Sequence, residues 1–529
     1  MPSSVFAAVL AGQPAALRLL PFDFTDQAAW RAAAERAATR NIAPGLLDEL
    51  VRQARALPPS AARDRHLERL ARPGTSVVVT GQQVGLFGGP LYTLHKAATA
   101  IARARLVEQL TGRPCVPLFW LQTEDHDYAE IAQVAFAGAS ERVVLALPPE
   151  PTPARVPLAH RVLPVGTQAL LDQLQGELAS LPQAAQLLTL LRAHYVVGRP
   201  IAAAFGGLLA ELFEAEGLLV LDPRVPAVAR LSAPLLQRVL DDHTGIASAL
   251  HARAASIAAA GCEEQVRTRD TASLVFFHPS GLQGPRYRLT RTADGFATPE
   301  GPVSARVLAE LLVSEPLRFS TSALLRPLVQ DTLLPSCAYV GGPAELSYFA
   351  QLPPIYERLG IPMPMIAPRA RLRVIDPATR SLLGRVGLSP SDLDEPLPTL
   401  LARVVAHKHG ALAAAELRAR LFSPLQRELD ALLALGLEGL ADPIRKTRQT
   451  CEQSITKLAE RAERAALERD QITSTRLARL ILALRPDGVA QERAYGFLAL
   501  AARTGHAALT RAILAAASSL DPAVCDVYP

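Results

Sequence analysis

The sequence has few of the residues that would indicate a secreted, membrane or metal-binding protein. Its five cysteines are an odd number, lie far apart and form no C-x-x-C pair, so neither a disulfide framework nor a cysteine-based zinc site is indicated. No apolar run approaches the roughly 20 uninterrupted residues of a membrane helix. No basic residue precedes Arg18, and Gln13-Pro14 interrupts the N-terminal apolar run, so a signal peptide is not expected. We therefore expect a cytoplasmic protein with reduced thiols and no membrane partner.

Lysine is almost absent, and arginine carries nearly all of the positive charge. Only four lysines occur among 529 residues, the net charge is +5, and aromatic residues make up 5% of the chain. A domain that binds nucleic acid usually gathers its arginines on one face among exposed aromatics. No such cluster is visible, so nucleic acid is not expected as a partner.

The chain is long enough for two or three structural units. Changes in the spacing of its apolar residues divide it into four parts. Residues 1–72 have apolar residues at helical spacing and are expected to pack on the core. Residues 73–390 alternate short apolar runs with helical patterns, whereas residues 391–485 have almost no strand signal. Residues 486–529 form an apolar tail that is expected to return to the core.

The second part begins with a pattern typical of a βαβ unit. The run Ser76–Thr80 is short and β-branched, Leu91–Leu110 has helical periodicity, and Cys115–Leu121 is a second apolar run. Leu218–Leu221 and Cys337–Val340 repeat the strand pattern. Continuously apolar strands imply a parallel sheet covered on both faces, so the predicted fold class is α/β.

Two stretches of this part are interpreted as insertions into the parallel-sheet domain. Residues 140–200 are rich in proline and contain two alternating runs, Val143–Leu147 and Arg161–Val165. Residues 265–300 have the pattern of a β-hairpin, with Ser273–His278 and Tyr287–Thr292 around a turn rich in glycine and proline.

The third part predicts a long helix that takes part in a coiled coil. Pro443–Leu484 contains no glycine and no further proline, and such a helix would extend roughly 60 Å. The predicted seam, with a 4-3-4-3 spacing, consists of Cys451, Ile455, Leu458, Ala462, Ala465 and Ile472. The helix cannot bury this stripe alone, so it pairs with Ser423–Leu435, with another subunit, or with both.

The most informative stretch is TGQQVGLFGGPLYTLHK, Thr80 to Lys96, which has four glycines in ten residues between a strand and a helix. Doubly wound sheets bind ligands at the carboxyl ends of their strands, and free backbone N–H groups at a helix start favour phosphate or carboxylate. The stretch matches neither G-x-G-x-x-G nor the Walker pattern. A tight turn whose glycines serve packing alone is the alternative.

Two further segments follow strands and are expected at the same edge of the sheet. Glu124 to Asp127 (EDHD) groups three carboxylates with an imidazole, which could hold an ammonium, ribose hydroxyls or Mg²⁺ and move protons. Its alternative role is a helix-capping acid cluster. Arg326 suits a carboxylate or phosphate, and Glu345 follows the glycines after the next strand, with a salt bridge and a helix cap as their alternatives.

These segments supply the candidate site residues. The candidate catalytic residues are His95, Lys96, Asp125, His126 and Asp127. The candidate substrate- or nucleotide-binding residues are Thr80, Gln82, Gln83, Gly85, Gly89, Tyr92, Glu124, Arg326, Gln330, Tyr339, Gly341, Gly342, Glu345, Tyr348 and Arg369. No set of metal ligands is predicted.

Several long motifs resemble the cysteine ligase family of bacillithiol biosynthesis, the BshC family. They are TGQQVGLFGGPLYTLHK, VPLFWLQTEDHDYAEI, LLRPLVQDTLLPSCAYVGGPAELSYFAQL and MPMIAPR, with LPFDF, GLLVLDP and DGVAQERAY in support. They occur in the same order along nearly the whole chain. The resemblance implies a Rossmann-like core related to class I nucleotidyl-transferring enzymes, with connecting-peptide insertions. It also implies an α-helical coiled coil that makes a homodimer.

The activity that the resemblance implies is the last step of bacillithiol synthesis, which joins the carboxyl group of cysteine to the amine of glucosaminyl-malate. On this hypothesis His95 and Lys96 hold a phosphate or carboxylate, Asp125 and Asp127 bind an ammonium, a ribose or Mg²⁺, and His126 accepts a proton. Arg326 and Arg369 are then candidates for the malate carboxylates.

The chain has no HxGH or KMSKS string, so ATP as the activating co-substrate, through an acyl-phosphate or an acyl-adenylate, is inferred from the fold alone. The sequence leaves two alternatives open: a non-catalytic dimeric binding or scaffold protein of the same pathway, and another adenylate-forming enzyme of the class I type.

Overall fold

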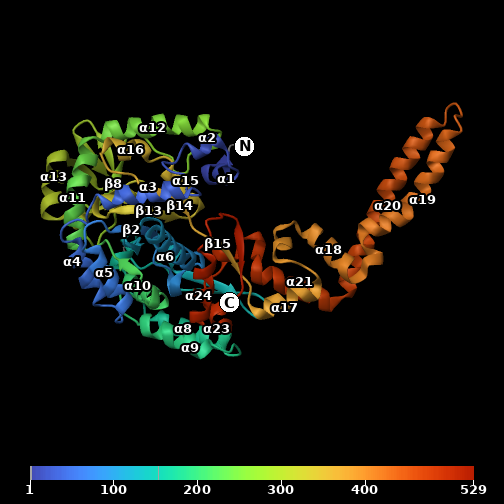
Figure 1. Cartoon of the computed structure of the whole chain (residues 1–529), viewed down its shortest axis with the longest axis horizontal. Helices are drawn as coiled ribbons and strands as arrows, with labels where there is room; N and C mark the ends of the chain where they lie inside the picture. Colours follow the sequence, from blue (N-terminus) through green and yellow to red (C-terminus); the bar gives the residue numbers. More distant parts are fainter. Residues whose placement is uncertain (1–2, 153) are drawn as a thin grey trace.

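The computed structural model describes residues 3–152 and 154–529. A compact body carries a long helical projection (Figure 1). The body is built on a five-stranded, fully parallel sheet of order β14-β13-β2-β3-β6. Its strands are β2 (Ser76–Gln82), β3 (Cys115–Leu121), β6 (Leu219–Leu221), β13 (Ser336–Gly341) and β14 (Met365–Pro368). The predicted α/β class is thereby confirmed.

The predicted βαβ unit is present, with helix α6 (Tyr92–Thr111) between β2 and β3. Every residue of both strands is buried, as expected of continuously apolar strands in a covered sheet. Helix α6 and the N-terminal helix α3 (Gln27–Ala38) pack on the sheet and on one another. The other N-terminal helices are α1 (Val5–Leu10), α2 (Pro14–Leu17), α4 (Leu46–Ala54) and α5 (Ala61–Leu70).

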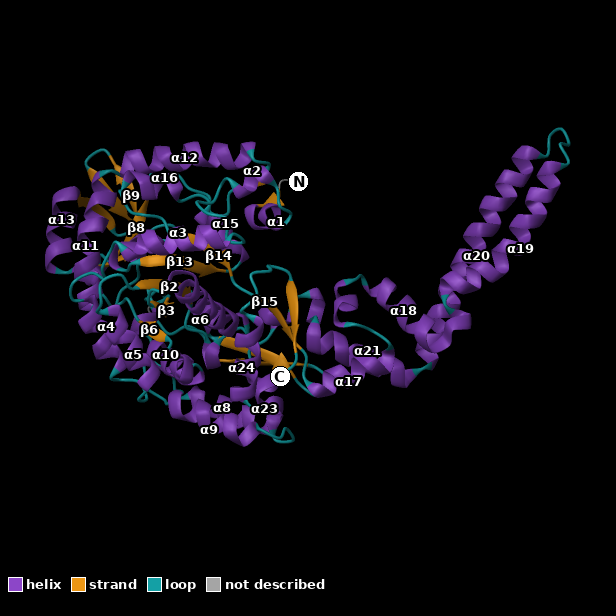
Figure 2. Cartoon of the chain, in the orientation of Figure 1, coloured by secondary structure: helices purple, strands orange, loops and turns teal. Residues whose placement is uncertain are grey.

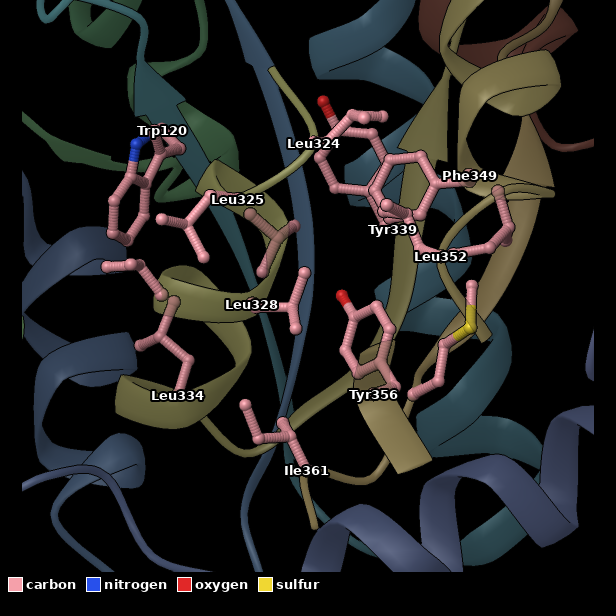
Figure 3. Packing of buried hydrophobic residues seen from close by; sticks show 14 of the residues in the cluster. Trp120, Leu324, Leu325, Leu328, Leu334, Tyr339, Phe349, Leu352, Tyr356 and Ile361 are labelled. Carbon is pink, nitrogen blue, oxygen red and sulfur yellow. The ribbon is translucent and has the colours of Figure 1, made fainter. Parts of the chain in front are cut away.

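A large apolar cluster lies around β13 and the helices that precede and follow it in the chain (Figure 3). It includes side chains of α14 (Arg326–Leu333), α15 (Pro343–Phe349) and α16 (Pro353–Arg358). The rings of Tyr339 and Phe349 are 4.7 Å apart between centroids. This packing fixes the loop after β13 relative to the sheet.

The first predicted insertion forms the hairpin β4 (Gln133–Ala137) and β5 (Arg142–Ala146), then helices α8 (Gly166–Leu178), α9 (Ala184–His194) and α10 (Ile201–Leu212). The first alternating run is thus a strand. The second, Arg161–Val165, is not: among the described residues it makes only an isolated bridge between Val162 and Pro200. Pro164 within it cannot donate a ladder hydrogen bond.

The second predicted insertion is larger than a hairpin. Strands β8 (Ala272–Phe277) and β9 (Tyr287–Thr292) pair as predicted, but they belong to an antiparallel sheet of order β11-β10-β9-β8-β12. Its other strands are β10 (Gly295–Thr298), β11 (Gly301–Ser304) and β12 (Phe319–Thr321). Nearby helices are α11 (Pro226–Asp241), α12 (His243–Ala259) and α13 (Ala305–Ser314).

The helical projection contains the coiled coil, a hairpin of α19 (Ala414–Ala434) and α20 (Ala441–Arg469) that lies far from the body (Figure 2). The predicted pairing with Ser423–Leu435 is therefore present. The predicted single helix to Leu484 is wrong, because Asp470 ends it. The Asp470 side chain accepts a hydrogen bond from Thr473 N (3.0 Å) and so caps a new helix, α21 (Gln471–Leu484).

The predicted seam is confirmed in part, because Cys451, Ile455 and Ala462 are partly buried. Leu458 and Ile472 are 56% and 65% exposed, whereas Ala459, the neighbour of Leu458, is 1% exposed. At that position the buried residue is therefore one place further along the chain than predicted. Helices α17 (Pro377–Val386) and α18 (Leu397–His409) join the projection to the body.

The C-terminal tail returns to the body as predicted. It forms α22 (Gln491–Ala494), α23 (Leu498–Thr504), α24 (His506–Ala516) and the strand β16 (Val524–Val527), which pairs in parallel with β15 (Arg371–Val374). Helix α24 packs on α6. No helix within residues 3–152 and 154–529 combines the length and the apolar character needed to cross a membrane.

Candidate functional site

A cavity of about 290 Å³ lies at the carboxyl ends of β2, β3 and β13. This is the edge at which open α/β sheets bind ligands. The cavity, called the main cavity below, is lined by Gln82, Gln83, Tyr92, Lys96, Trp120, Leu121, Gln122, Glu124, Asp125, Glu130, Arg286, Thr321, Ser322, Ala323, Arg326, Gly342, Pro343, Ala344, Glu345, Tyr348, Arg369 and Arg493. Segments from four distant parts of the chain therefore meet at one site.

The structure brings together the three segments that the sequence analysis singled out. The candidate residues that line the main cavity are Gln82, Gln83, Tyr92, Lys96, Glu124, Asp125, Arg326, Gly342, Glu345, Tyr348 and Arg369. The candidates that do not are Thr80, Gly85, Gly89, His95, His126, Asp127, Gln330, Tyr339 and Gly341. Most of the second group hold residues of the first group in place.

Lys96 is a buried ammonium group on the wall of the main cavity. It forms an ion pair with Glu345 and donates to Gly81 O (2.7 Å) and Gln82 Oε1 (2.9 Å). Glu345 also accepts from Tyr339 OH (2.6 Å) and Gly342 N (2.8 Å). Burial lowers the pKa of Lys96 although Glu345 opposes this effect. The lysine thus ties the end of β2 to the loop after β13.

Arg326 is the cation of the main cavity whose hydrogen-bond partners are neutral. Its guanidinium donates to Gln330 Oε1 (2.9 Å) and Tyr348 OH (3.3 Å) and lies 5.0 Å from the ring centroid of Tyr339. Its side chain is 7% exposed. Burial lowers its pKa, but Tyr339, Tyr348 and Glu345 outweigh burial and raise it above the ordinary value. No carboxylate is hydrogen-bonded to Arg326 among the described residues, and Arg326 lines the main cavity, so its guanidinium is suited to receive an anion.

Arg369 is held by a carboxylate from the C-terminal tail. Glu492 accepts from Arg369 Nη2 (2.7 Å) and Nη1 (2.5 Å), and it lies 3.0 Å from His95 Nδ1. Burial raises the pKa of the Glu492 carboxyl, but His95 and Arg369 outweigh it and hold that pKa well below the usual range. Burial lowers the pKa of His95. His95 is therefore a buried support of the Arg369–Glu492 pair.

The acidic wall of the main cavity consists of carboxylates from the segment directly after β3. Glu124 accepts from Thr321 N (3.3 Å) and Thr321 Oγ1 (2.5 Å). Asp125 accepts from Gln83 Nε2 (2.7 Å) and Arg286 Nη2 (3.2 Å). Both carboxylates are thus held at the cavity by neighbouring donors, and Asp125 alone of the two is paired with a guanidinium.

His126 and Asp127 have structural contacts outside the main cavity. Arg286 Nε donates to His126 Nδ1 (2.9 Å), and burial followed by the charge of Arg286 lowers the pKa of His126. Asp127 caps the short helix α7 (Tyr128–Ile131) by accepting from Glu130 N (3.1 Å). Glu130, one turn further on, lines the cavity, and burial and then nearby Asp127 and Asp125 raise its pKa although Gln83 opposes this.

The glycines of the predicted loop serve close packing. A Cβ on Gly85 would lie 2.7 Å from Gly89 Cα, which only glycine avoids. Gly88 has φ +87° and its N–H donates to Tyr195 OH (2.9 Å) in the first insertion. This part of the loop faces the insertion, while Gln82 and Gln83 before it line the main cavity.

Sequence reasoning missed several lining residues. Arg286 comes from the second insertion, Arg493 from the C-terminal tail, and Glu130 from the helix after EDHD. For the two arginines no local signal exists, because their approach to the cavity depends on tertiary packing. Glu130 could have been found, since a short helix after EDHD would place it near the same edge.

Both halves of the chain match models of one protein family. The N-terminal Rossmann-like domain of bacillithiol biosynthesis BshC matches residues 2–370, and the C-terminal coiled-coil domain of BshC matches residues 372–521.

Curated relatives agree with these matches. Proteins named "Putative cysteine ligase BshC" from Solibacter usitatus, Koribacter versatilis and Salinibacter ruber are 33%, 33% and 31% identical over 449, 446 and 487 residues. The alignments cover 83%, 83% and 89% of this chain and 82%, 81% and 86% of the relatives.

Proposed function

Since the chain belongs to the BshC family of bacillithiol biosynthesis, we propose that it is the cysteine ligase that joins the carboxyl group of L-cysteine to the amine of glucosaminyl-malate in the last step of that pathway. The observation that carries this proposal is Arg326, a buried guanidinium that lines the main cavity and is hydrogen-bonded to neutral groups. A dicarboxylic substrate would supply the missing counter-charge.

The two carboxylates of malate require two cationic contacts. Arg326 supplies one, and Arg369 supplies the other through its Nε, which is buried and has no hydrogen-bond partner among the described residues. Glu492 occupies the other two nitrogens of Arg369. The ion pair with Glu492 fixes the orientation of the remaining Nε–H group of Arg369, so a substrate carboxylate would meet a preorganised donor.

The acidic wall suits the ammonium group of cysteine. Glu124 lines the main cavity and accepts hydrogen bonds from Thr321, and its charge also acts on the nearby Arg224 and Arg286. Amide formation also requires a neutral amine, and Glu130 is the proton acceptor that we assign to the attacking amine. It lines the main cavity, and burial raises the pKa of its carboxyl toward the range of a useful base. This role replaces the one that the sequence suggested for His126.

Activation of the cysteine carboxyl requires a leaving group, which we assign to ATP. The carboxylate would attack phosphorus to give an acyl-phosphate with ADP or an acyl-adenylate with pyrophosphate, and the amine would then expel phosphate or AMP. No group of three histidine, cysteine, aspartate or glutamate side chains within the described ranges could hold a metal ion. Mg²⁺ usually keeps several waters and is bound by substrate phosphates and one or two carboxylates; Asp125, which is paired with Arg286, lines the main cavity.

The direct test incubates the purified protein with cysteine, glucosaminyl-malate and ATP and measures the product by mass spectrometry. We expect the amide product together with ADP or AMP, and neither in the absence of one substrate. Substrate binding without product under all conditions would instead indicate the scaffold role.

We also propose a homodimer formed through the coiled coil, in a cytoplasmic setting where the five unpaired cysteines stay reduced. The α19–α20 hairpin extends away from the body (Figure 1). It exposes Leu421, Leu432, Leu433, Leu435 and Leu458 by 43% to 64%. Leucines in such number on an isolated hairpin are typical of an interface.

A further inference from the structure

A second cavity, called the side cavity here, adjoins the main cavity. It has a volume of about 170 Å³ and lies between the β4–β5 hairpin and the segment after α22. It is lined by Pro90, Glu130, Gln133, Val134, Ala135, Arg142, Val144, Arg493, Ala494, Tyr495 and Gly496. Glu130 and Arg493 line both cavities, so this pair lies between the main cavity and the side cavity.

The main cavity alone is small for the proposed reaction. Pockets for small molecules are usually about 300 to 1,000 Å³, and the main cavity, at about 290 Å³, would have to take an amino acid and an amino-sugar conjugate together. The side cavity enlarges the space beyond the proposed proton acceptor. Part of a substrate that extends past Glu130 would enter it.

The walls of the side cavity have the composition that a sugar ring requires. Glu130, Gln133, Arg142 and Arg493 provide acceptors and donors, and Val134, Val144 and Tyr495 provide apolar surface. The hydroxyl of Tyr495 donates to Leu482 O (2.6 Å), which fixes its ring. A hydroxylated ring with apolar faces matches such a mixture of convergent polar groups and apolar surface.

We propose that the side cavity is the subsite for the sugar ring of the amino-sugar substrate, with Glu130 and Arg493 at the junction. This inference rests on the proposed function. The malate and the amine of glucosaminyl-malate lie on neighbouring ring carbons. With the malate at Arg326 and Arg369 and the amine at Glu130, the side cavity is the neighbouring space in which the rest of the ring would lie.

The competing occupant is the nucleotide, and the wall chemistry disfavours it. Phosphates are usually bound by helix N-termini and by several cations. In the side cavity Arg142 lies 3.9 Å from Asp487, and Glu130 adds a carboxylate at the junction. A neutral polyol meets no such charge conflict.

The test compares two exposed valines of the same insertion. Val144 lines the side cavity and is 45% exposed, whereas Val165 lines neither cavity and is 80% exposed. Val144→Phe fills the side cavity, and Val165→Phe is the matched control. The dissociation constants of malate, glucosaminyl-malate and ADP are measured by calorimetry for the full-length protein and both variants.

We expect Val144→Phe to weaken glucosaminyl-malate binding by about tenfold, which corresponds to about 1.4 kcal/mol, and to leave malate and ADP within twofold. Val165→Phe changes none of the three. Unchanged glucosaminyl-malate binding in Val144→Phe overturns the sugar subsite, and a selective loss of ADP binding assigns the side cavity to the nucleotide instead. If the wild type itself neither binds glucosaminyl-malate nor forms product, the proposed function fails and not the subsite alone.

Discussion

Replacement of Arg326 by methionine tests whether this arginine binds the substrate or only stabilises the fold. The substitution keeps much of the side-chain volume and removes the charge. A hydrogen bond to a charged group contributes about 1.5 to 3 kcal/mol, so the loss of the malate contact should raise KM for glucosaminyl-malate about 10- to 150-fold. Because the partners of Arg326 are the neutral groups of Gln330 and Tyr348, the folded protein loses no carboxylate pair, and its stability without ligand should change little or increase.

Two assays decide the matter. Steady-state kinetics with varied glucosaminyl-malate and saturating cysteine give KM, and thermal unfolding without substrate gives Tm. Arg326→Lys serves as the conservative variant, since it keeps the charge but loses the two-pronged geometry, and should recover part of the affinity. An unchanged KM together with a clearly lowered Tm would refute the reasoning and make Arg326 a structural residue.

Three further predictions concern the support of the site and the assembly. Glu492→Gln leaves Arg369 as an unpaired buried charge and should lower the free energy of unfolding by about 3 to 5 kcal/mol in urea titrations. Because the pKa of Glu492 is depressed in the folded protein, its contribution to stability is present above about pH 4.3 and is lost as the pH falls further. Equal stability of the variant and the wild type at neutral pH would contradict this prediction. Gly85→Ala places a Cβ 2.7 Å from Gly89 Cα and should cost about 1 to 3 kcal/mol by the same titration, whereas a neutral result would mean that the loop can relax. Leu432→Glu on the coiled coil should convert the proposed dimer to a monomer in light scattering after size exclusion, and a dimer of unchanged strength would place the interface elsewhere.

The parallel sheet and the edge at which the site lies could be predicted from the sequence because both follow from local patterns. The run Cys115–Leu121 is predicted to the residue, since a continuous apolar run bounded by polar residues leaves no freedom in its limits. Strand ends in a parallel sheet lie at one edge, so Gln82, Glu124 and Gly342 could be expected to meet. They do line one cavity.

The sequence did not predict as well which side chains of a helix face the main cavity. Tyr92 and Lys96 are four residues apart on α6 and share the face toward the main cavity, whereas His95 lies about 100° from Lys96 around the helix. His95 and Lys96 were both expected to contact an anion because they lie in the first turns of the helix after the glycine-rich loop. In a helix, adjacency places two side chains on different faces, and His95 points to Glu492 instead.

The coiled coil shows a different limit. The break at Asp470 depends on a single capping side chain within a stretch of good helix formers, and a heptad pattern does not register it. At one seam position the exposed Leu458 is replaced by the buried Ala459, whereas Cys451 and Ile455 are partly buried as predicted. Periodicity thus predicted that two helices pair, but not every residue of their contact.

The C-terminal tail completes the main cavity, which brings the motif DGVAQERAY next to motifs that lie before residue 370 in the sequence. Gln491 ties the tail to β15 through Val374, donating to its carbonyl (2.9 Å) and accepting from its N–H (2.8 Å). The next residue, Glu492, reaches across 397 positions of sequence to His95 and holds Arg369. Arg493 then lines both cavities. Three consecutive residues therefore anchor the tail, hold Arg369 in place and contribute a lining side chain. The Rossmann-like domain alone would lack all three, so the segment after the coiled coil is a part of the site itself.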